Sequence, residues 1–356
     1  MTTQQSVDQA KTEAFLGKVL SDTSGMTMTI MASIGDRLGL FKQLAHGSAT
    51  SAQLATRADI NERYAREWLG AMASAGYVEY DPASERFTLP AEHMPVLAQE
   101  HGPIFFGGIH QMLAGMVGPL NQLIQAFQHG GGVPQSAYDH NMWDGLERFT
   151  AGKFENLLIP VWQPAMPEVQ ARLERGALLA DVGCGRGKAL IKLAQAFPRS
   201  RYVGYDIFEP TIAQATAQAQ AAGVADRVRF EHRDVSAGLP EQYDVITTFD
   251  VIHDAIDPRG LLRTIRQALR SDGRYVCLDI NCAERLEGNA GPLGSLFYGF
   301  SVLYCMTTSL SGHGEGLGTV GLPEGKLQEL SLEAGFSSVR RVPLENPFNN
   351  LYELQP

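Results

Sequence analysis

A glycine-rich loop offers the clearest chemistry in the sequence. Residues 181–187 read Asp-Val-Gly-Cys-Gly-Arg-Gly and lie between an apolar run at 177–182 and a helix-like run at 188–197. Glycine lets a backbone approach a ligand closely, and open α/β sheets bind ligands at the carboxyl ends of their strands. The loop therefore predicts a small-molecule site where a first parallel strand ends.

Acidic residues stand at the ends of four successive strand-like runs, at Asp181, Asp206, Asp234 and Asp250. A dinucleotide site would show G-x-G-x-x-G and hold a pyrophosphate at the helix N-terminus. This loop shows G-x-G-x-G with an acid two residues before it, which suits a positively charged ligand better. The carboxylate at 206 can accept both hydroxyls of a ribose. The alternative is that these acids cap the helices that follow the strands.

From residue 178 to residue 280 the chain resembles the class I, Rossmann-like methyltransferases that use S-adenosylmethionine. The resemblance implies that the glycine loop shapes the methionine pocket, with Asp181 near the amino group of the cofactor. It also implies that Asp206 holds the ribose and Asp234 the adenine. The cofactor-binding residues expected from it are Asp181, Gly183, Cys184, Gly185, Gly187, Asp206, Ile207, Asp234, Val235, Phe249 and Asp250.

His253 follows the fourth strand-like run, close to where the methyl group of such a cofactor lies. Imidazole titrates near neutral pH and can take a proton from a hydroxyl. The whole chain is similar to small-molecule O-methyltransferases, and this similarity implies that His253 is the base, with Asp254 beside it. It is more similar still to bacterial methyltransferases labelled as transcriptional regulators, which it resembles in the segments Cys305-Met-Thr-Thr-Ser-Leu and Asn346-Pro-Phe-Asn-Asn-Leu-Tyr-Glu. The alternative is a structural histidine bonded to Asp254 or Asp257.

The acceptor site is expected to be apolar and aromatic, because the run at 293–310 has no charges and follows the fifth strand-like run. Tyr298 and Tyr304 in this run, Trp143 in an earlier helix and His313 in a glycine-rich loop are the predicted substrate contacts. His253 and His313 could also hold a metal, as histidines do in some 2-oxo-acid C-methyltransferases that this chain resembles. Metal sites usually need three or more protein ligands, so two histidines are a weak signal. The acceptor atom, oxygen or carbon, stays open.

Three segments are expected to position these residues. Residues 1–97 show helical runs at 28–44, 51–58 and 62–75 and then a strand pair at 77–80 and 86–89, which is the winged-helix pattern. Residues 98–170 are expected to be a helical linker that covers the active site. Residues 171–356 alternate strands with helices, which predicts an α/β fold: a Rossmann-like, seven-stranded doubly wound sheet that ends in an antiparallel strand pair at 338–342 and 349–354.

The excess of acidic residues indicates which binding partners the chain can have. The formal net charge is −10, and residues 48–92 carry four arginines, no lysine and seven acids. Nucleic acid and anionic membranes are therefore unexpected partners, and the winged helix is expected to support a homodimer. Two alternatives stay open: a DNA-binding transcriptional regulator that uses the methyltransferase fold as a ligand sensor, and a non-catalytic sensor of S-adenosylmethionine. Four cysteines without a CxxC pair, and no evident signal peptide, predict a soluble cytoplasmic protein.

Overall fold

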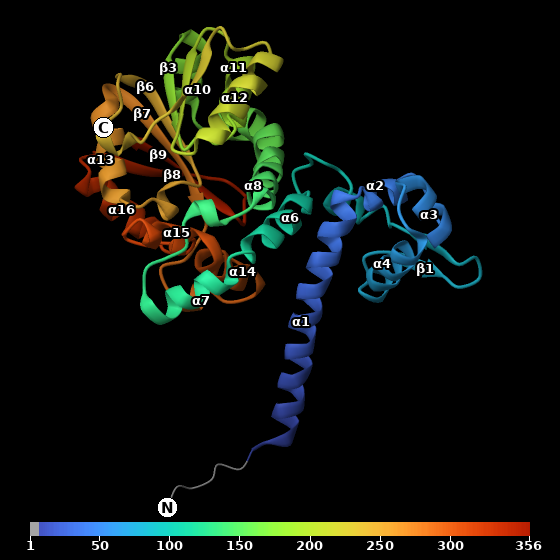
Figure 1. The fold of residues 1–356 in the computed structure, drawn as a ribbon. Helices are drawn as coiled ribbons and strands as arrows, with labels where there is room; N and C mark the ends of the chain where they lie inside the picture. Colours follow the sequence, from blue (N-terminus) through green and yellow to red (C-terminus); the bar gives the residue numbers. More distant parts are fainter. Residues whose placement is uncertain (1–6) are drawn as a thin grey trace, which may run out of the picture. The chain divides into compact units, whose positions relative to one another are not determined.

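The computed structural model describes residues 7–356, which divide into two compact units (Figure 1). Among these residues, unit 1 comprises 7–115 and His140–Gly152, and unit 2 comprises Met116–Asp139 and Lys153–Pro356. We describe each unit by itself. Both units draw helices from residues 98–170, and the division into three segments predicted from the sequence stays a proposal.

Unit 1 is a helical domain with a short hairpin, as the winged-helix pattern predicts. Its helices are α1 (Gln9–Arg37), α2 (Leu40–Ala45), α3 (Ser51–Ala58), α4 (Glu62–Ser74), α5 (Met94–Leu97), α6 (Gly107–Met116) and α8 (His140–Lys153), and its hairpin pairs β1 (Glu79–Asp81) with β2 (Arg86–Thr88). Thr50 and Gln53 form a capping box on α3, and Asn61 caps α4 through the backbone N–H of Arg63. The predicted helix at 28–44 is wrong at one point, because Gly39, at φ +71°, separates α1 from α2.

The apolar face of α4 forms the core of unit 1. Trp68 packs edge-on against Phe41 with ring centroids 5.0 Å apart, and its indole N–H donates to the carbonyl of Met31 at 2.8 Å. Trp68, Leu69 and Met72 are buried within their own unit, so this face of α4 is not available to a second copy of the chain.

Unit 2 is built on a seven-stranded sheet with the order β5-β4-β3-β6-β7-β9-β8. The strands from β5 to β7 are parallel, and β9 runs antiparallel to both β7 and β8. The strands are β3 (Leu178–Val182), β4 (Arg201–Asp206), β5 (Val228–His232), β6 (Tyr243–Phe249), β7 (Leu269–Ile280), β8 (Ser338–Val342) and β9 (Asn349–Gln355). From β3 the chain proceeds outward through β4 to β5 on one side of the sheet, and then continues from β6 to β7 on the other side. Ligands of such sheets bind at the switch point, here between β3 and β6.

Helices cover both faces of this sheet (Figure 1). Leu179 packs with α10 (Pro167–Arg175), α11 (Lys188–Ala196) and α12 (Glu209–Ala221), whereas its neighbour Ala180 packs with α13 (Pro258–Ala268) and α16 (Glu324–Glu333). Successive side chains of a strand point to opposite faces, so the continuous apolar run of β3 is explained by burial on both sides. The predicted α/β doubly wound architecture is confirmed.

The remaining helical segments of unit 2 surround the carboxyl ends of the strands or link its elements. They are α7 (Leu120–His129), η1 (Gln135–Ala137), η2 (Phe154–Trp162), α9 (Gln163–Ala165), η3 (Val235–Ala237), η4 (Ile252–Asp254), η5 (Leu286–Asn289), α14 (Pro292–Phe300), η6 (Ser301–Cys305) and α15 (Met306–Ser311). Both η2 and η6 are π-helices, a form found mostly at functional sites. By length and composition alone, the helix Pro292–Ser311 could cross a membrane, and half of its apolar window is buried in the protein.

Candidate functional site

The glycine loop follows β3 and turns sharply three times. Gly183, Gly185 and Gly187 have φ angles of +73°, +51° and +76°, which side chains other than glycine rarely adopt. A Cβ on Gly183 would lie 2.6 Å from Cγ2 of Val251, and a Cβ on Gly187 would overlap the ring of Phe230. A Cβ on Gly185 would meet no atom within 4 Å. The first and third glycines therefore allow tight packing, whereas Gly185 faces open space that a ligand can use.

Asp206 ties the end of β4 to this loop. Its Oδ2 accepts from the backbone N–H of Gly185 at 2.8 Å, and its Oδ1 accepts from the N–H of Phe208 at 2.9 Å. Burial raises the pKa of this carboxyl above the usual 3.8, although the two backbone donors act to lower it. The next side chain, Ile207, is 54% exposed, which offers an apolar surface beside the carboxylate.

Asp181 lies deeper than a ligand-binding acid at the surface of a pocket would. Its side chain is buried, and Thr247 of β6 donates to its Oδ1 at 2.6 Å. Burial, reinforced by the nearby charge of Asp206, raises the pKa of Asp181 to about 7. A cation in front of these two acids would relieve their repulsion, so the predicted contact with an ammonium group stays a prediction.

Three of the other predicted cofactor residues have local structural roles. The sulfur of Cys184 packs close to Gly204 of β4. Asp234 is exposed and caps η3 by accepting from the N–H of Ser236 at 2.9 Å, as the capping alternative predicts. Val235 is buried in the core between the sheet and α13. Their contacts with a cofactor stay predictions.

Phe249 and Asp250 end β6 in an environment that the sequence did not reveal. Phe249 stacks on Trp162 of η2, with centroids 6.1 Å apart and planes 26° apart. Asp250 has a φ of +58° and accepts at Oδ1 from the side-chain amide of Asn349 at 2.5 Å. The Nζ of buried Lys153 lies 3.7 Å from the other oxygen of Asp250 and donates to Oδ1 of Asn349 at 2.7 Å.

Burial sets the protonation balance of this cluster. It raises the pKa of Asp250 and lowers the pKa of Lys153, while each charge acts on the other in the opposite direction. Lys153, Asn349 and Trp162 lie far from Asp250 in the sequence, and no spacing links them to it. Only the fold brings them together.

His253 is buried and paired with a carboxylate. Its Nδ1 lies 2.7 Å from Oδ1 of Asp279, which also accepts from the N–H of Ile280 at 2.8 Å. Burial acts to lower the pKa of His253, but Asp279 and Cys305 outweigh it and hold that pKa well above 6.5. The alternative of a bond to Asp254 or Asp257 is wrong, because the partner is Asp279 and Asp257 instead caps α13.

Two tyrosines contact each other beside Cys305, which interacts with His253. Tyr304, in η6, is buried, and its hydroxyl accepts from the side-chain amide of Gln135 at 3.1 Å. Tyr138 meets it edge-on at 5.2 Å and donates to the carbonyl of Leu303 at 2.6 Å. Burial raises the pKa of Asp254 to about 7. Asp254 interacts electrostatically with both Tyr304 and His253, so the three side chains form one cluster.

For the other predicted substrate residues, contact with an acceptor stays a prediction. Tyr298 of α14 is 38% exposed, and His313 is exposed in the loop after α15 with a φ of +60°. Trp143 lies on α8 in unit 1, and its substrate role stays a prediction. Within residues 7–356, the metal-ligating atoms grouped around His253 come from Asp254 and Cys305, all within 4.8 Å of one another. His313 is not in this group, so the predicted metal pair of His253 and His313 is not supported.

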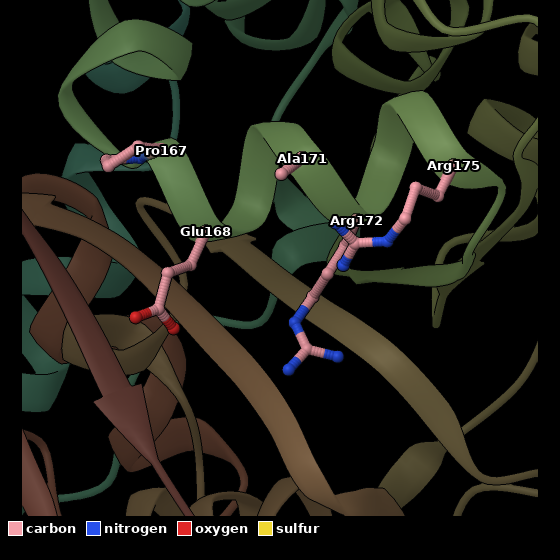
Figure 2. Close-up of a pocket in the computed structure, with 5 residues that line it drawn as sticks. All are labelled: Pro167, Glu168, Ala171, Arg172 and Arg175. Atoms are coloured by element: carbon pink, nitrogen blue, oxygen red, sulfur yellow. The ribbon is translucent and has the colours of Figure 1, made fainter.

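A shallow pocket on α10 lies at the opposite end of the sheet (Figure 2). Figure 2 shows Glu168 and Arg172 pointing from α10 toward the strands. Glu168 pairs with Arg274, and Arg172 pairs with Asp272 at 3.0 Å, near the start of the parallel part of β7. Ligands of such sheets bind at the carboxyl ends of the strands, so this pocket is not the candidate site.

Two family models match the two parts of the chain. Residues 26–99 match the family described as "Rv2258c-like winged HTH domain", and residues 180–275 match the family described as "Methyltransferase domain". The chain is an S-adenosylmethionine-dependent methyltransferase. Its N-terminal winged helix and Rossmann-like core agree with the resemblance found in the sequence.

Relatives match nearly the whole methyltransferase. It is 25% identical over 339 residues to O-demethylpuromycin-O-methyltransferase of Streptomyces alboniger, which covers 87% of this chain and 86% of that protein. The solved structure of mitomycin 7-O-methyltransferase MmcR shares the fold with a TM-score of 0.71 and 20% identity, over 98% of this chain and 99% of that one. The structure of human N-acetylserotonin methyltransferase in complex with S-adenosylmethionine also shares it, with a TM-score of 0.70 and 16% identity over 99% of each chain.

The residues at the carboxyl ends of β3 and β4 fit S-adenosylmethionine. The space in front of Gly185 leaves room for a ligand at the backbone. Asp206 can accept hydroxyl donors with the lone pairs that the two backbone N–H groups leave free. The raised pKa values of Asp181 and Asp206 indicate an edge where a cation is favoured over an anion.

Proposed function

We propose that this methyltransferase transfers a methyl group to a hydroxyl oxygen of a small aromatic molecule. The buried pair of His253 and Asp279, 2.7 Å apart, is the observation on which the proposal depends most. Val251, two residues before His253, would contact a side chain at Gly183, so the histidine turn lies against the glycine loop. The names of the Streptomyces alboniger relative and of MmcR support oxygen as the acceptor atom.

The carboxyl ends of β3, β4 and β6 would hold S-adenosylmethionine. Gly185 would allow the methionine part close to the backbone, Asp206 would accept from the ribose hydroxyls, and Phe249 would pack against an apolar part of the cofactor. When bound, the cofactor supplies a methyl group on a sulfonium, already activated for displacement. The protein therefore contributes mainly alignment and proton removal.

His253 is the group that would remove the acceptor proton. Asp279 holds Nδ1, which leaves Nε2 as the ring nitrogen that can face a hydroxyl. Asp279 also stabilises the imidazolium that forms when the proton arrives. Because Asp279 and Cys305 raise the pKa of His253, His253 becomes the free base at higher pH than an ordinary imidazole does. The rate is therefore expected to rise as the pH increases above neutrality.

The cluster beside His253 would receive the acceptor. The rings of Tyr304 and Tyr138 meet edge-on, an arrangement that suits contact with a further aromatic ring. Asp254, with a pKa of about 7, carries a proton part of the time and can then donate to an acceptor oxygen. A neutral or phenolic acceptor suits this acidic surrounding better than a carboxylate does.

A second copy of the chain is the proposed partner of α1. Apolar side chains of α1 recur at helical spacing and are exposed, and they are Phe15, Leu16, Val19, Leu20, Met26, Ile30 and Ile34. Such a stripe is suited to packing against another helix. The winged helix offers little to DNA, since Arg63 pairs with Glu67 and Arg66 with Glu62 on the same helix. A cytoplasmic location stays a prediction.

Acceptor-dependent formation of S-adenosylhomocysteine tests the proposed function. Purified protein is incubated with S-adenosylmethionine and a panel of phenols, catechols and hydroxyquinones between about pH 6 and about pH 10. We expect turnover that rises with pH and that falls about 10²- to 10⁴-fold in His253→Gln, which keeps the side chain polar but removes the base. Turnover unaffected by His253→Gln would overturn the role of His253.

A further inference from the structure

Three side chains of different chemistry converge beside the proposed base. His253 and Asp254 come from η4, and Cys305 comes from the last position of the π-helix η6. One ligand atom of each, an imidazole nitrogen, a carboxylate oxygen and a thiol sulfur, lies within 4.8 Å of the other two. His253 and Cys305 are buried, and Asp254 is half-buried. The proposed proton transfer uses His253 alone, so it does not explain why a thiol lies here.

The orientation of His253 is that of a metal ligand. Histidines that bind metals usually give their second ring nitrogen to a carboxylate, which fixes the ring, and Asp279 holds Nδ1 of His253 in this way at 2.7 Å. Asp279 is itself fixed by the backbone N–H groups of Ile252 and Ile280 at 3.2 and 2.8 Å. The nitrogen Nε2 is thereby left for the cluster.

The donor set selects among metals. Nitrogen, oxygen and thiolate sulfur together are the ligands of Zn²⁺, whereas Mg²⁺ and Ca²⁺ take oxygen ligands. Zinc bonds of about 2.0–2.3 Å in a tetrahedron place neighbouring donors about 3.5 Å apart. Small side-chain rotations would bring donors within 4.8 Å to that spacing. Three protein ligands leave a fourth position for water.

We propose that His253, Asp254 and Cys305 bind Zn²⁺, and that the bound ion inhibits methyl transfer by occupying Nε2 of His253. On binding, the metal–nitrogen, metal–oxygen and metal–sulfur bonds form, and the protons of the thiol and of any protonated imidazole or carboxyl pass to solvent. No atom is oxidised or reduced. The inhibitory part rests on the proposed function, because it requires His253 to be the base, whereas the binding site itself does not.

Binding is tested with the full chain and Co²⁺, which replaces Zn²⁺ and absorbs light. Metal-free protein is titrated with Co²⁺, and the thiolate-to-cobalt charge-transfer band is followed in the near ultraviolet. We expect one Co²⁺ per chain with this band, displaced by one equivalent of Zn²⁺. Cys305→Ser is expected to lose the band, and Cys282→Ser, which removes another buried cysteine that is not in the cluster, is expected to keep it.

Folding of each variant is checked by its affinity for S-adenosylhomocysteine. A wild-type titration without the band, or a folded Cys305→Ser that keeps the band, would overturn the site. For inhibition, acceptor-dependent turnover is measured with a chelator and with rising Zn²⁺. We expect full turnover in the chelator and loss of turnover at one equivalent of Zn²⁺, with the Zn²⁺ concentration for half-inhibition about tenfold higher or more in Cys305→Ser.

The outcomes separate this inference from the proposed function. Turnover in the chelator without any binding of Co²⁺ or Zn²⁺ would overturn the metal site and leave the methyl transfer standing. Metal binding with the thiolate band, but no turnover under any condition, would support the site and overturn the proposed function. Turnover that requires Zn²⁺ would overturn the inhibitory role.

Discussion

Replacement of Asp206 by alanine tests the placement of the cofactor. The carboxylate of Asp206 joins two elements of the site, since it accepts from the N–H of Gly185 at 2.8 Å and from the N–H of Phe208 at 2.9 Å. Its remaining lone pairs are the proposed acceptors of the two ribose hydroxyls. The variant therefore removes both the ribose contacts and the tether of the glycine loop.

The expected loss follows from these hydrogen bonds. A hydrogen bond to a charged group contributes about 1.5–3 kcal/mol, so two ribose contacts correspond to about 3–6 kcal/mol. Each 1.4 kcal/mol is about tenfold in affinity, and Asp206→Ala should therefore weaken binding of S-adenosylhomocysteine about 10²- to 10⁴-fold. Asp206→Asn keeps the volume and one oxygen, and its loss should be smaller, at about 10- to 100-fold.

Calorimetric titration of S-adenosylhomocysteine into each protein gives these affinities. Asp226→Ala is the matched control, because Asp226 is an exposed acid that pairs with Arg227 at 2.7 Å, near the start of β5 and away from the carboxyl ends of the strands. Its affinity should equal that of the wild type. A folded Asp206→Ala protein with wild-type affinity would refute the assignment of the ribose to this carboxylate.

Three further predictions concern the loop, the buried acid and α1. Gly183→Ala should lower the free energy of unfolding by about 2–4 kcal/mol, because it adds left-handed backbone strain to a contact of 2.6 Å with Val251. Gly185→Ala should lower it by only about 1–2 kcal/mol, yet weaken cofactor binding strongly. Equal losses for the two variants in urea unfolding would contradict this. Burial raises the pKa of Asp181 to about 7 in the folded protein, so the free energy of unfolding should fall by up to about 4 kcal/mol as the pH rises from about 4 to about 7. Asp181→Asn should remove this pH dependence in urea unfolding without ligand. A variant with the same pH dependence as the wild type would be evidence against it. Leu20→Glu, on the exposed stripe of α1, should convert a dimer to a monomer in sedimentation analysis, and a wild-type monomer would remove the proposed partner.

The core of unit 2 could be predicted because its strands are buried on both faces. β5 and β6 coincide with strand-like runs in the sequence, at 228–232 and 243–249, and the rule for parallel sheets places the acids that follow these runs at one edge. The start of β7 cannot be recognised in the sequence, because residues 270–272 are polar and lie in the register shift between the pairs Tyr243–Leu269 and Val245–Arg274. No apolar pattern marks such a strand.

The site could be predicted only where it lies within one motif. The glycine loop, Asp206 and His253 can be recognised from their spacing, whereas nothing in the sequence marks Asp279 as the partner of His253. Its role depends on β6 and β7 being neighbours, which the sequence does not state. Cys305 likewise reaches His253 through a π-helix that no propensity predicts.

Transfer of a ¹³C-labelled methyl group tests the central claim most directly. The chain is incubated with S-adenosylmethionine labelled in its methyl group and with the phenol, catechol and hydroxyquinone panel, and the products are examined by ¹³C NMR. The account predicts a methoxy signal on at least one acceptor, absent without protein and strongly reduced in His253→Gln. Label found on carbon, or S-adenosylhomocysteine-binding protein that transfers label to no hydroxyl of the panel, would contradict it.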